Sequence, residues 1–159
     1  MFLRTELLPS KKLIGMKLTM SLTENKTPLL WKSFMQRRKE ITTAVGTDLI
    51  SMQQYPAGYF DSFSPTTEFI KWAAIEVVDV NKIPEGMEAI ILPGGLYAVF
   101  LHRGSASEGA KTFQYIFQTW LPGSEWSLDD RPHFELLGEK YKHDDPTSEE
   151  EIWIPILKK

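Results

Sequence analysis

The same order of predicted elements, namely strand, helix, strand and strand, occurs twice along this chain of 159 residues. In each half, a strand with alternating apolar residues is followed by a helix and then by two further strands. The last strands of the two halves, FIKWAAIEV at residues 69–77 and EIWIPI at 151–156, both carry a tryptophan near the middle. This repetition predicts two strand–helix–strand–strand modules, over about residues 1–80 and 87–159; a single α+β sheet with accidental similarity is the alternative.

Each half contains one predicted helix. The first begins at Thr27 and Pro28, a capping residue followed by a proline, and its apolar residues keep helical spacing to about residue 41. The second begins near Ser107 and ends at Pro122. One helix cannot cover both faces of a sheet, so the two helices share one face if the halves join. We therefore expect an α+β fold in which an antiparallel sheet carries both helices on one face and a ligand groove on the other.

The closing strand has two unlike faces. Ile152, Ile154 and Ile156 occupy alternate positions and form an apolar face that we expect to lie in the core. Glu151 and Trp153 alternate with these isoleucines and point to the opposite face. An acid beside a large ring, pointing away from its own core, marks this second face as a candidate binding surface.

The composition excludes several kinds of chemistry. The chain contains no cysteine, which rules out disulfides, zinc–thiolate sites and cysteine nucleophiles. Its three histidines lack the spacing of metal ligands, so we expect neither a metal nor a cofactor. The net charge of −3 offers no general attraction to nucleic acid. We find no signal peptide or membrane span, and we expect a cytoplasmic protein that does not bind a membrane.

Four short motifs follow one another in the second half. They are YAVFLHRG at residues 97–104, TWLPGSEW at 119–126, RPHFELL at 131–137 and EIWIPI at 151–156. In this order and spacing they resemble the GyrI-like small-molecule-binding domain, also called the AraC-type effector-binding domain. The resemblance runs over nearly the whole chain and implies a single domain over residues 1–159. It also implies two modules related by a pseudo-twofold axis, with a ligand groove between them.

The resemblance implies a groove that combines acids with aromatic rings. Several members of the family prefer flat hydrophobic cations, which a carboxylate pairs with while ring faces add stacking and cation–π attraction. The matching positions are Glu135 in RPHFELL and the pair Glu151 and Trp153 in EIWIPI, and we expect the two acids to face each other in one groove. The residues predicted to bind the ligand are Glu135, Glu151, Trp153, Trp72, Tyr97, Tyr59, Tyr55 and Phe100.

The expected partner is therefore a hydrophobic, cationic small molecule. Family members include ligand-sensing domains of transcription regulators, but neither predicted helix is free to form a helix-turn-helix, so we expect no direct binding to nucleic acid. The acids Glu149 and Glu150, which precede the closing strand, are interpreted as solvated charge.

Other functions remain open. A hydrolase of cyclopropane-bearing electrophiles would use Glu135 or Glu151 as the general base that activates water. The family often has a tyrosine where Leu137 stands, which counts against this hydrolase and favours a non-catalytic protein. A protein partner is also open, as in the gyrase-inhibitor branch of the family, and so is haem, as in a relative with a similar duplicated layout.

Overall fold

The structure is a computed structural model that describes residues 1–159, apart from the side chain of Ala106. The strands are β1 (Phe2–Leu8), β2 (Lys11–Met20), β3 (Ala44–Gln54), β4 (Phe69–Val77), β5 (Glu88–Leu92), β6 (Gly95–Arg103), β7 (Trp126–Leu128), β8 (His133–Leu137) and β9 (Glu149–Lys158). The helices are α1 (Thr27–Arg37) and α2 (Gly109–Tyr115), with short turns η1 (Arg38–Glu40) and η2 (Ala106–Glu108) and a π-helical turn η3 (Ile116–Trp120). Within this described part of the chain, no helix is long and apolar enough to cross a membrane.

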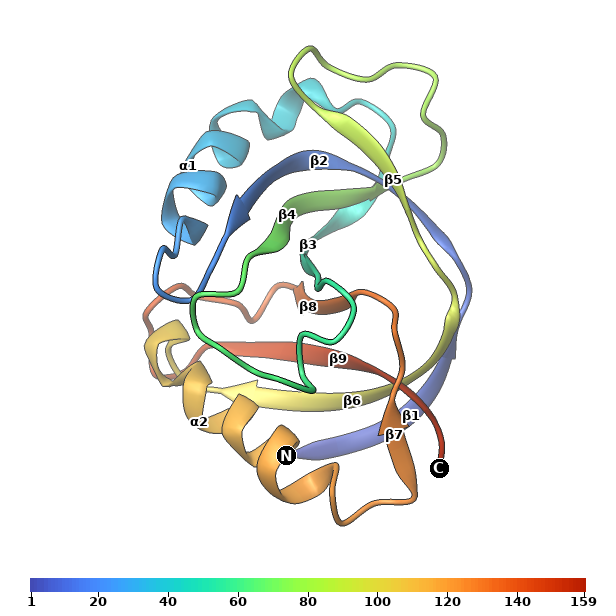
Figure 1. Cartoon of the computed structure of the whole chain (residues 1–159). Helices are drawn as coiled ribbons and strands as arrows, with labels where there is room; N and C mark the ends of the chain where they lie inside the picture. The colour runs from blue at the N-terminus through green and yellow to red at the C-terminus, as the bar shows by residue number, and fades with distance from the viewer.

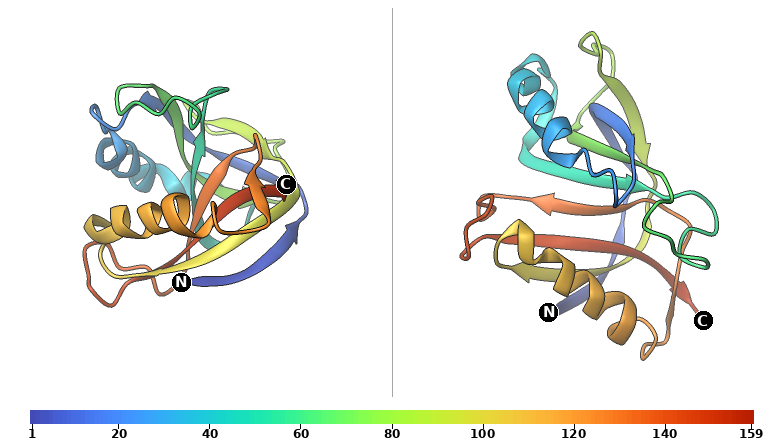
Figure 2. Two further views of the ribbon diagram at one scale, coloured as in Figure 1. Left: turned by 60° about the horizontal axis from the view of Figure 1, so that its bottom comes forward. Right: turned by 60° about the vertical axis from the view of Figure 1, so that its left-hand side comes forward.

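The two predicted modules are present as β2–α1–β3–β4 and β6–α2–β8–β9. They join in one sheet with the order β1-β6-β9-β8-β3-β4-β2-β5, in which β8 of the second module pairs antiparallel with β3 of the first. Both helices lie on the same face of this sheet, one over each module (Figure 1). The right-hand view of Figure 2 shows the middle strands β3, β8 and β9 running between them. The predicted α+β class, with both helices on one face, is confirmed.

A long bent ribbon connects the two edges of the sheet. β1 and β2 are separated only by Pro9 and Ser10, and β5 and β6 only by Pro93 and Gly94. β1 pairs with β6 and β2 pairs with β5, so both segments bend together on the side of the molecule away from the helices (Figure 1). A Cβ atom on Gly94 would lie 2.7 Å from the carbonyl oxygen of Leu8, so the crossing requires glycine.

The strand β1 was not predicted from the sequence, and its place in the fold differs from its place in the chain. It precedes the first module but pairs with β6, a strand of the second module. The first module therefore begins in space at β2 rather than at residue 1.

Three hydrophobic clusters fill the fold, and one of them occupies the face that was expected to be open. One cluster lies under α1 and includes Leu30 and Phe34, which are four residues apart on that helix. A second, which includes Ile116, packs beneath η3. The third lies on the opposite face of the sheet and includes Leu13, Met52 and Leu92, all fully buried. The face away from the helices is therefore largely a core, because the β1–β2 and β5–β6 ribbon curves over it.

Candidate ligand site on the helix face of the sheet

The pairing of β8 with β9 decides which predicted site residues share a face. Leu136 lies opposite Glu151, whereas Glu135 lies opposite Ile152. Directly opposed residues of an antiparallel pair point to the same side, and neighbours along a strand point to opposite sides. Glu135 therefore shares the helix face with Ile152, and Glu151 and Trp153 point to the other face. The expectation that both acids line one groove is wrong, because the two acids point to opposite faces of the sheet.

Three of the other predicted residues are core residues. Trp72 and Tyr97 belong to the cluster on the face away from the helices, with exposed fractions of 2% and 0%. Phe100 belongs to the cluster beneath η3 and packs edge-on against Trp120. Each ring is buried against protein, so none of the three presents a free surface to a ligand in this structure.

The acid and the ring of the closing strand already hold a cation. Glu151 and Trp153 line a cavity of about 510 Å³ on the face away from the helices. The guanidinium of Arg4 lies 5.6 Å from the centre of the Trp153 ring and 3.6 Å from the Glu151 carboxylate. The Trp153 indole N–H also donates a hydrogen bond of 3.0 Å to Glu151 Oε1. The predicted pairing of a carboxylate and an aromatic ring around a cation is therefore present, but the cation is Arg4 of the chain itself.

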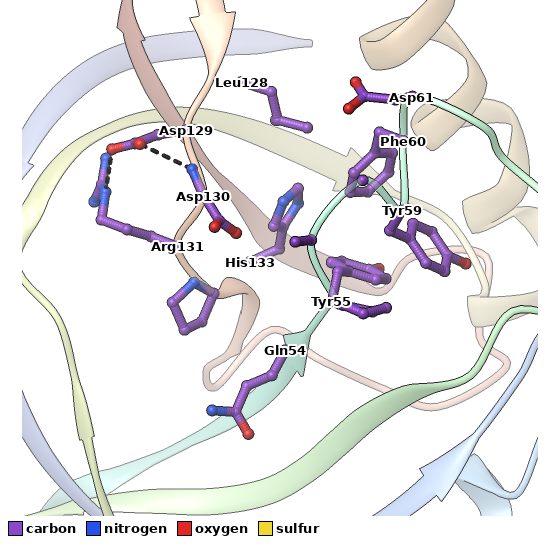
Figure 3. A pocket seen from close by; sticks show the side chains of 14 residues that line it. Gln54, Tyr55, Tyr59, Phe60, Asp61, Leu128, Asp129, Asp130, Arg131 and His133 are labelled. Atoms are coloured by element: carbon purple, nitrogen blue, oxygen red, sulfur yellow. Dashed lines mark hydrogen bonds and ion pairs between the residues drawn. The ribbon is translucent and has the colours of Figure 1, made fainter.

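A second cavity, of about 430 Å³, lies where β3 ends and β8 begins (Figure 3). Its wall comes from the segment after β3, which contributes Tyr55, Tyr59 and Phe60, and from His133 at the start of β8. The predicted residues Tyr55 and Tyr59 thus lie together here. Its other lining residues are Gln54, Pro56, Ala57, Gly58, Asp61, Leu128, Asp129, Asp130, Arg131 and Pro132. We call this space the aromatic cavity.

The rings of the aromatic cavity form one continuous cluster. The centre of the Tyr55 ring lies 4.5 Å from that of Tyr59 and 4.9 Å from that of His133. Phe60 stacks on His133 at 5.3 Å and on Phe117 of η3 at 5.1 Å. The segment after β3 of the first module therefore packs its rings against the second module. π-helical turns such as η3 are frequent at functional sites.

The charge of the aromatic cavity is negative. Three aspartates, Asp61, Asp129 and Asp130, stand against one arginine, Arg131. That arginine is already bound, since its Nε donates to Asp129 at 2.7 Å and its Nη2 to the carbonyl of Leu96 at 2.6 Å. Figure 3 shows the Asp129–Arg131 pair on the opposite side of the cavity from Tyr59. A cation entering the cavity meets an excess of carboxylates.

His133 contributes an uncharged ring. Burial, with a further contribution from the nearby charge of Arg131, lowers the pKa of His133 to about 3. The imidazole is therefore neutral near pH 7, and it packs against both Phe60 and Phe117 like another aromatic residue.

Behind this ring cluster lies a buried ionic group centred on Glu135. Its Oε1 atom accepts a hydrogen bond of 3.1 Å from the Gln53 side chain and lies 3.6 Å from the Lys71 ammonium. Its Oε2 atom is buried and has no hydrogen-bond partner among the described residues. Glu135 is close enough to the aromatic cavity that its charge, after burial, raises the pKa of Tyr55. A buried carboxylate oxygen without a donor is costly, which makes this atom a natural point of contact for a bound cation.

Glu150 adds a second acid to the ionic group, and the interpretation of this residue as solvated charge is wrong. It is partly buried on β9. Burial and then the charge of Glu135 raise the pKa of Glu150 to about 7, while Lys71 acts in the opposite direction. Near neutral pH this carboxyl is therefore present in both its protonated and its ionised form.

Sequence reasoning missed the two residues that hold Glu135. Gln53 and Lys71 stand on strands β3 and β4 of the first module, far from RPHFELL in the sequence. One signal was available: Lys71 is the single cation inside the otherwise apolar stretch FIKWAAI. A lysine inside a buried strand is rare unless its charge is paired. In the described part of the chain, no three histidine or acidic side chains are arranged to hold a metal ion.

An aromatic cavity on a two-module α+β sheet, with an excess of acid and a buried carboxylate behind it, is the kind of site that binds small organic molecules. The chain belongs to the family of GyrI-like small molecule binding domains, whose family model matches residues 1–157. The resemblance drawn from the four sequence motifs is thereby confirmed.

Known relatives agree with this assignment. The chain is 30% identical over 154 residues to the transcriptional regulator BrlR of Pseudomonas aeruginosa, a match that covers 93% of this chain and 53% of BrlR. The chain thus spans about half the length of this curated relative. The structure of SAV2435 bound to tetraphenylphosphonium superposes with a TM-score of 0.72 at 17% identity and covers 99% of this chain and 94% of that one. The EcmrR C-terminal domain superposes with a TM-score of 0.74 at 13% identity, covering 100% and 99%. At these identities the two structures show the shared fold.

Proposed function

We propose that the chain binds hydrophobic cations in the aromatic cavity, with Glu135 as the counter-ion, and that it serves as a cytoplasmic effector-binding domain in transcription regulation. The single observation that carries the proposal is the buried Oε2 atom of Glu135, which has no hydrogen-bond partner among the described residues. The tetraphenylphosphonium of SAV2435 and the regulatory role of BrlR support the choice of ligand and of process.

The route to Glu135 passes through the ring cluster. Tyr55 and Phe60 pack against His133, which stands two residues before Glu135 on the same face of β8. The aromatic rings of a ligand would replace contacts that these side chains make with one another, so the stacking area lost between side chains is regained with the ligand. We propose that the segment after β3 rearranges when the ligand enters.

The experiment is a titration with tetraphenylphosphonium by isothermal calorimetry. In Glu135→Gln the shape is kept and the charge removed, and we expect binding to weaken by at least tenfold, since a partly buried ion pair is lost. The matched control is Glu151→Gln on the opposite face, which should bind within twofold of the wild type. If Glu151→Gln weakens binding and Glu135→Gln does not, the ligand occupies the other cavity and the proposed site is wrong.

A further inference from the structure

The ion pair between Lys71 and Glu135 is an unusual feature of a site for cations. Both side chains are buried, each with an exposed fraction of 10%. Removing an ammonium from water costs free energy, and burial is tolerated when the attraction to a carboxylate offsets this cost. The chain therefore maintains its own cation at the position where the ligand's charge would lie.

The pair is loosely made. The 3.6 Å between Lys71 Nζ and Glu135 Oε1 is longer than the roughly 2.7–2.9 Å of a charge-assisted hydrogen bond. The same oxygen is shared with the Gln53 amide, and the other oxygen has no hydrogen-bond partner among the described residues. A lysine side chain is long and flexible, so a loosely held ammonium can move without a change in the strands.

A second acid lies within electrostatic range of the same ammonium. The charges of Glu135 and Lys71 act in opposite directions on the pKa of Glu150, which burial and Glu135 raise to about 7. The other titratable groups around Glu150 are His102, its cross-strand partner on β6, and Tyr141, whose own pKa is raised by burial and by the charge of Glu150. His102 is engaged by Thr112 and by the Ser105 carbonyl, which leaves Lys71 as the cation placed to respond.

We propose, building on the binding of cations at Glu135, that Lys71 is a specificity-determining residue that competes with the ligand for this acid. In the free protein the ammonium neutralises Glu135. When a ligand cation reaches Glu135, the ammonium moves toward Glu150, and that carboxyl gives up its proton to the solvent. One cation enters and one proton leaves, so the buried group keeps the same net charge. Neutral molecules of the same shape gain nothing from Glu135 and do not displace Lys71.

The first test compares Lys71→Met with the wild type at pH 8, using tetraphenylphosphonium and neutral triphenylphosphine oxide as probes. Methionine keeps much of the length of lysine and removes the charge. We expect the affinity for tetraphenylphosphonium to rise at least tenfold and that for the neutral probe to change by less than threefold. The control is Lys17→Met, because Lys17 stands over the Trp72 ring on the opposite face, and it should leave both affinities within twofold.

The second test uses the wild-type protein and does not depend on the folding of Lys71→Met. Calorimetry at pH 6.5 in buffers of different ionisation enthalpy counts the protons released with tetraphenylphosphonium. We expect more than half a proton for the wild type and none for Glu150→Gln. Equal proton release by the wild type and by Glu150→Gln would overturn the proposed exchange of a ligand cation for the Glu150 proton.

The outcomes separate this inference from the proposed function. If Lys71→Met binds the cation no better than a wild type that does bind it, Lys71 does not compete and the inference is wrong. If Lys71→Met binds the cation and the wild type does not, the inference is supported, because Lys71 then blocks the site in the wild type. If neither protein binds the cation, the proposed function fails, and the inference fails with it.

Discussion

Replacing Glu150 with glutamine should make the protein more stable at high pH and leave its stability below about pH 4 almost unchanged. The pKa of Glu150 is about 7 in the folded protein and close to 4.5 in the unfolded chain, because burial and the charge of Glu135 disfavour the ionised form. A group with a raised folded pKa stabilises the fold below its unfolded pKa, and this contribution is lost as the pH rises through the folded pKa. Between pH 4.5 and 7 the wild type therefore loses stability that Glu150→Gln retains.

The size of the effect follows from the two pKa values. The interval between 4.5 and about 7 corresponds to about 3 kcal/mol of unfolding free energy, since each pKa unit is worth about 1.4 kcal/mol. We expect the difference between Glu150→Gln and the wild type to grow from near zero below about pH 4 to this value at pH 8. Because Glu150 is partly exposed to solvent, about 3 kcal/mol is an upper figure.

The assay is urea unfolding of both proteins at pH 5, 6, 7 and 8, followed by tryptophan fluorescence. The readout is the difference between the two proteins, because His133 has the opposite pH dependence and partly cancels the effect of Glu150 in the wild type. The control is Glu149→Gln, on the other face of the strand and paired with Arg103, which tests whether removing any acid from this strand gives the same trend. A difference in unfolding free energy between Glu150→Gln and the wild type that does not change from pH 5 to pH 8 would refute the argument.

Three further changes test other parts of the structure. Gly15→Ala places a Cβ atom 2.1 Å from the carbonyl oxygen of Ala73, so we expect a loss of about 3 kcal/mol in urea unfolding; an unchanged midpoint would contradict the tight approach of β2 to β4. For His133 the folded pKa of about 3 lies below the ordinary 6.5, so the wild type should lose about 1.4 kcal/mol per pH unit between about pH 6 and 3; His133→Phe should lack this component in acid titrations, and matching acid profiles would contradict it. Arg4→Ala removes an exposed cation, so stability should fall by less than about 1 kcal/mol while Trp153 fluorescence shifts to the red; an unshifted spectrum would show that Arg4 does not cover the ring.

Local alternation along the sequence determined much of the fold. Ile152, Ile154 and Ile156 alternate, and all three are buried as that pattern predicts. The repeated order of strand, helix, strand and strand determined the two modules. Each module has one helix, which cannot cover both faces of a sheet, so the two helices were expected on one face. These inferences succeeded because each depends on residues that are neighbours in the chain. The strand β1 was missed, since most of its residues are exposed and its pairing partner lies in the second module.

Only the tertiary structure decided which acid faces the helices. The sequence showed that Glu135 alternates with Leu136, and that Glu151 alternates with Ile152, but it contained no information on how β8 is aligned with β9. A shift of one residue in that register exchanges every side chain between the two faces. The observed register separates the two acids, and the middle strands then bring Lys71 to Glu135 across β3. The position of each acid along its strand is thus a property of the sequence, while its partner, Arg4 for Glu151 and Lys71 for Glu135, follows from contacts between strands that are distant in the chain.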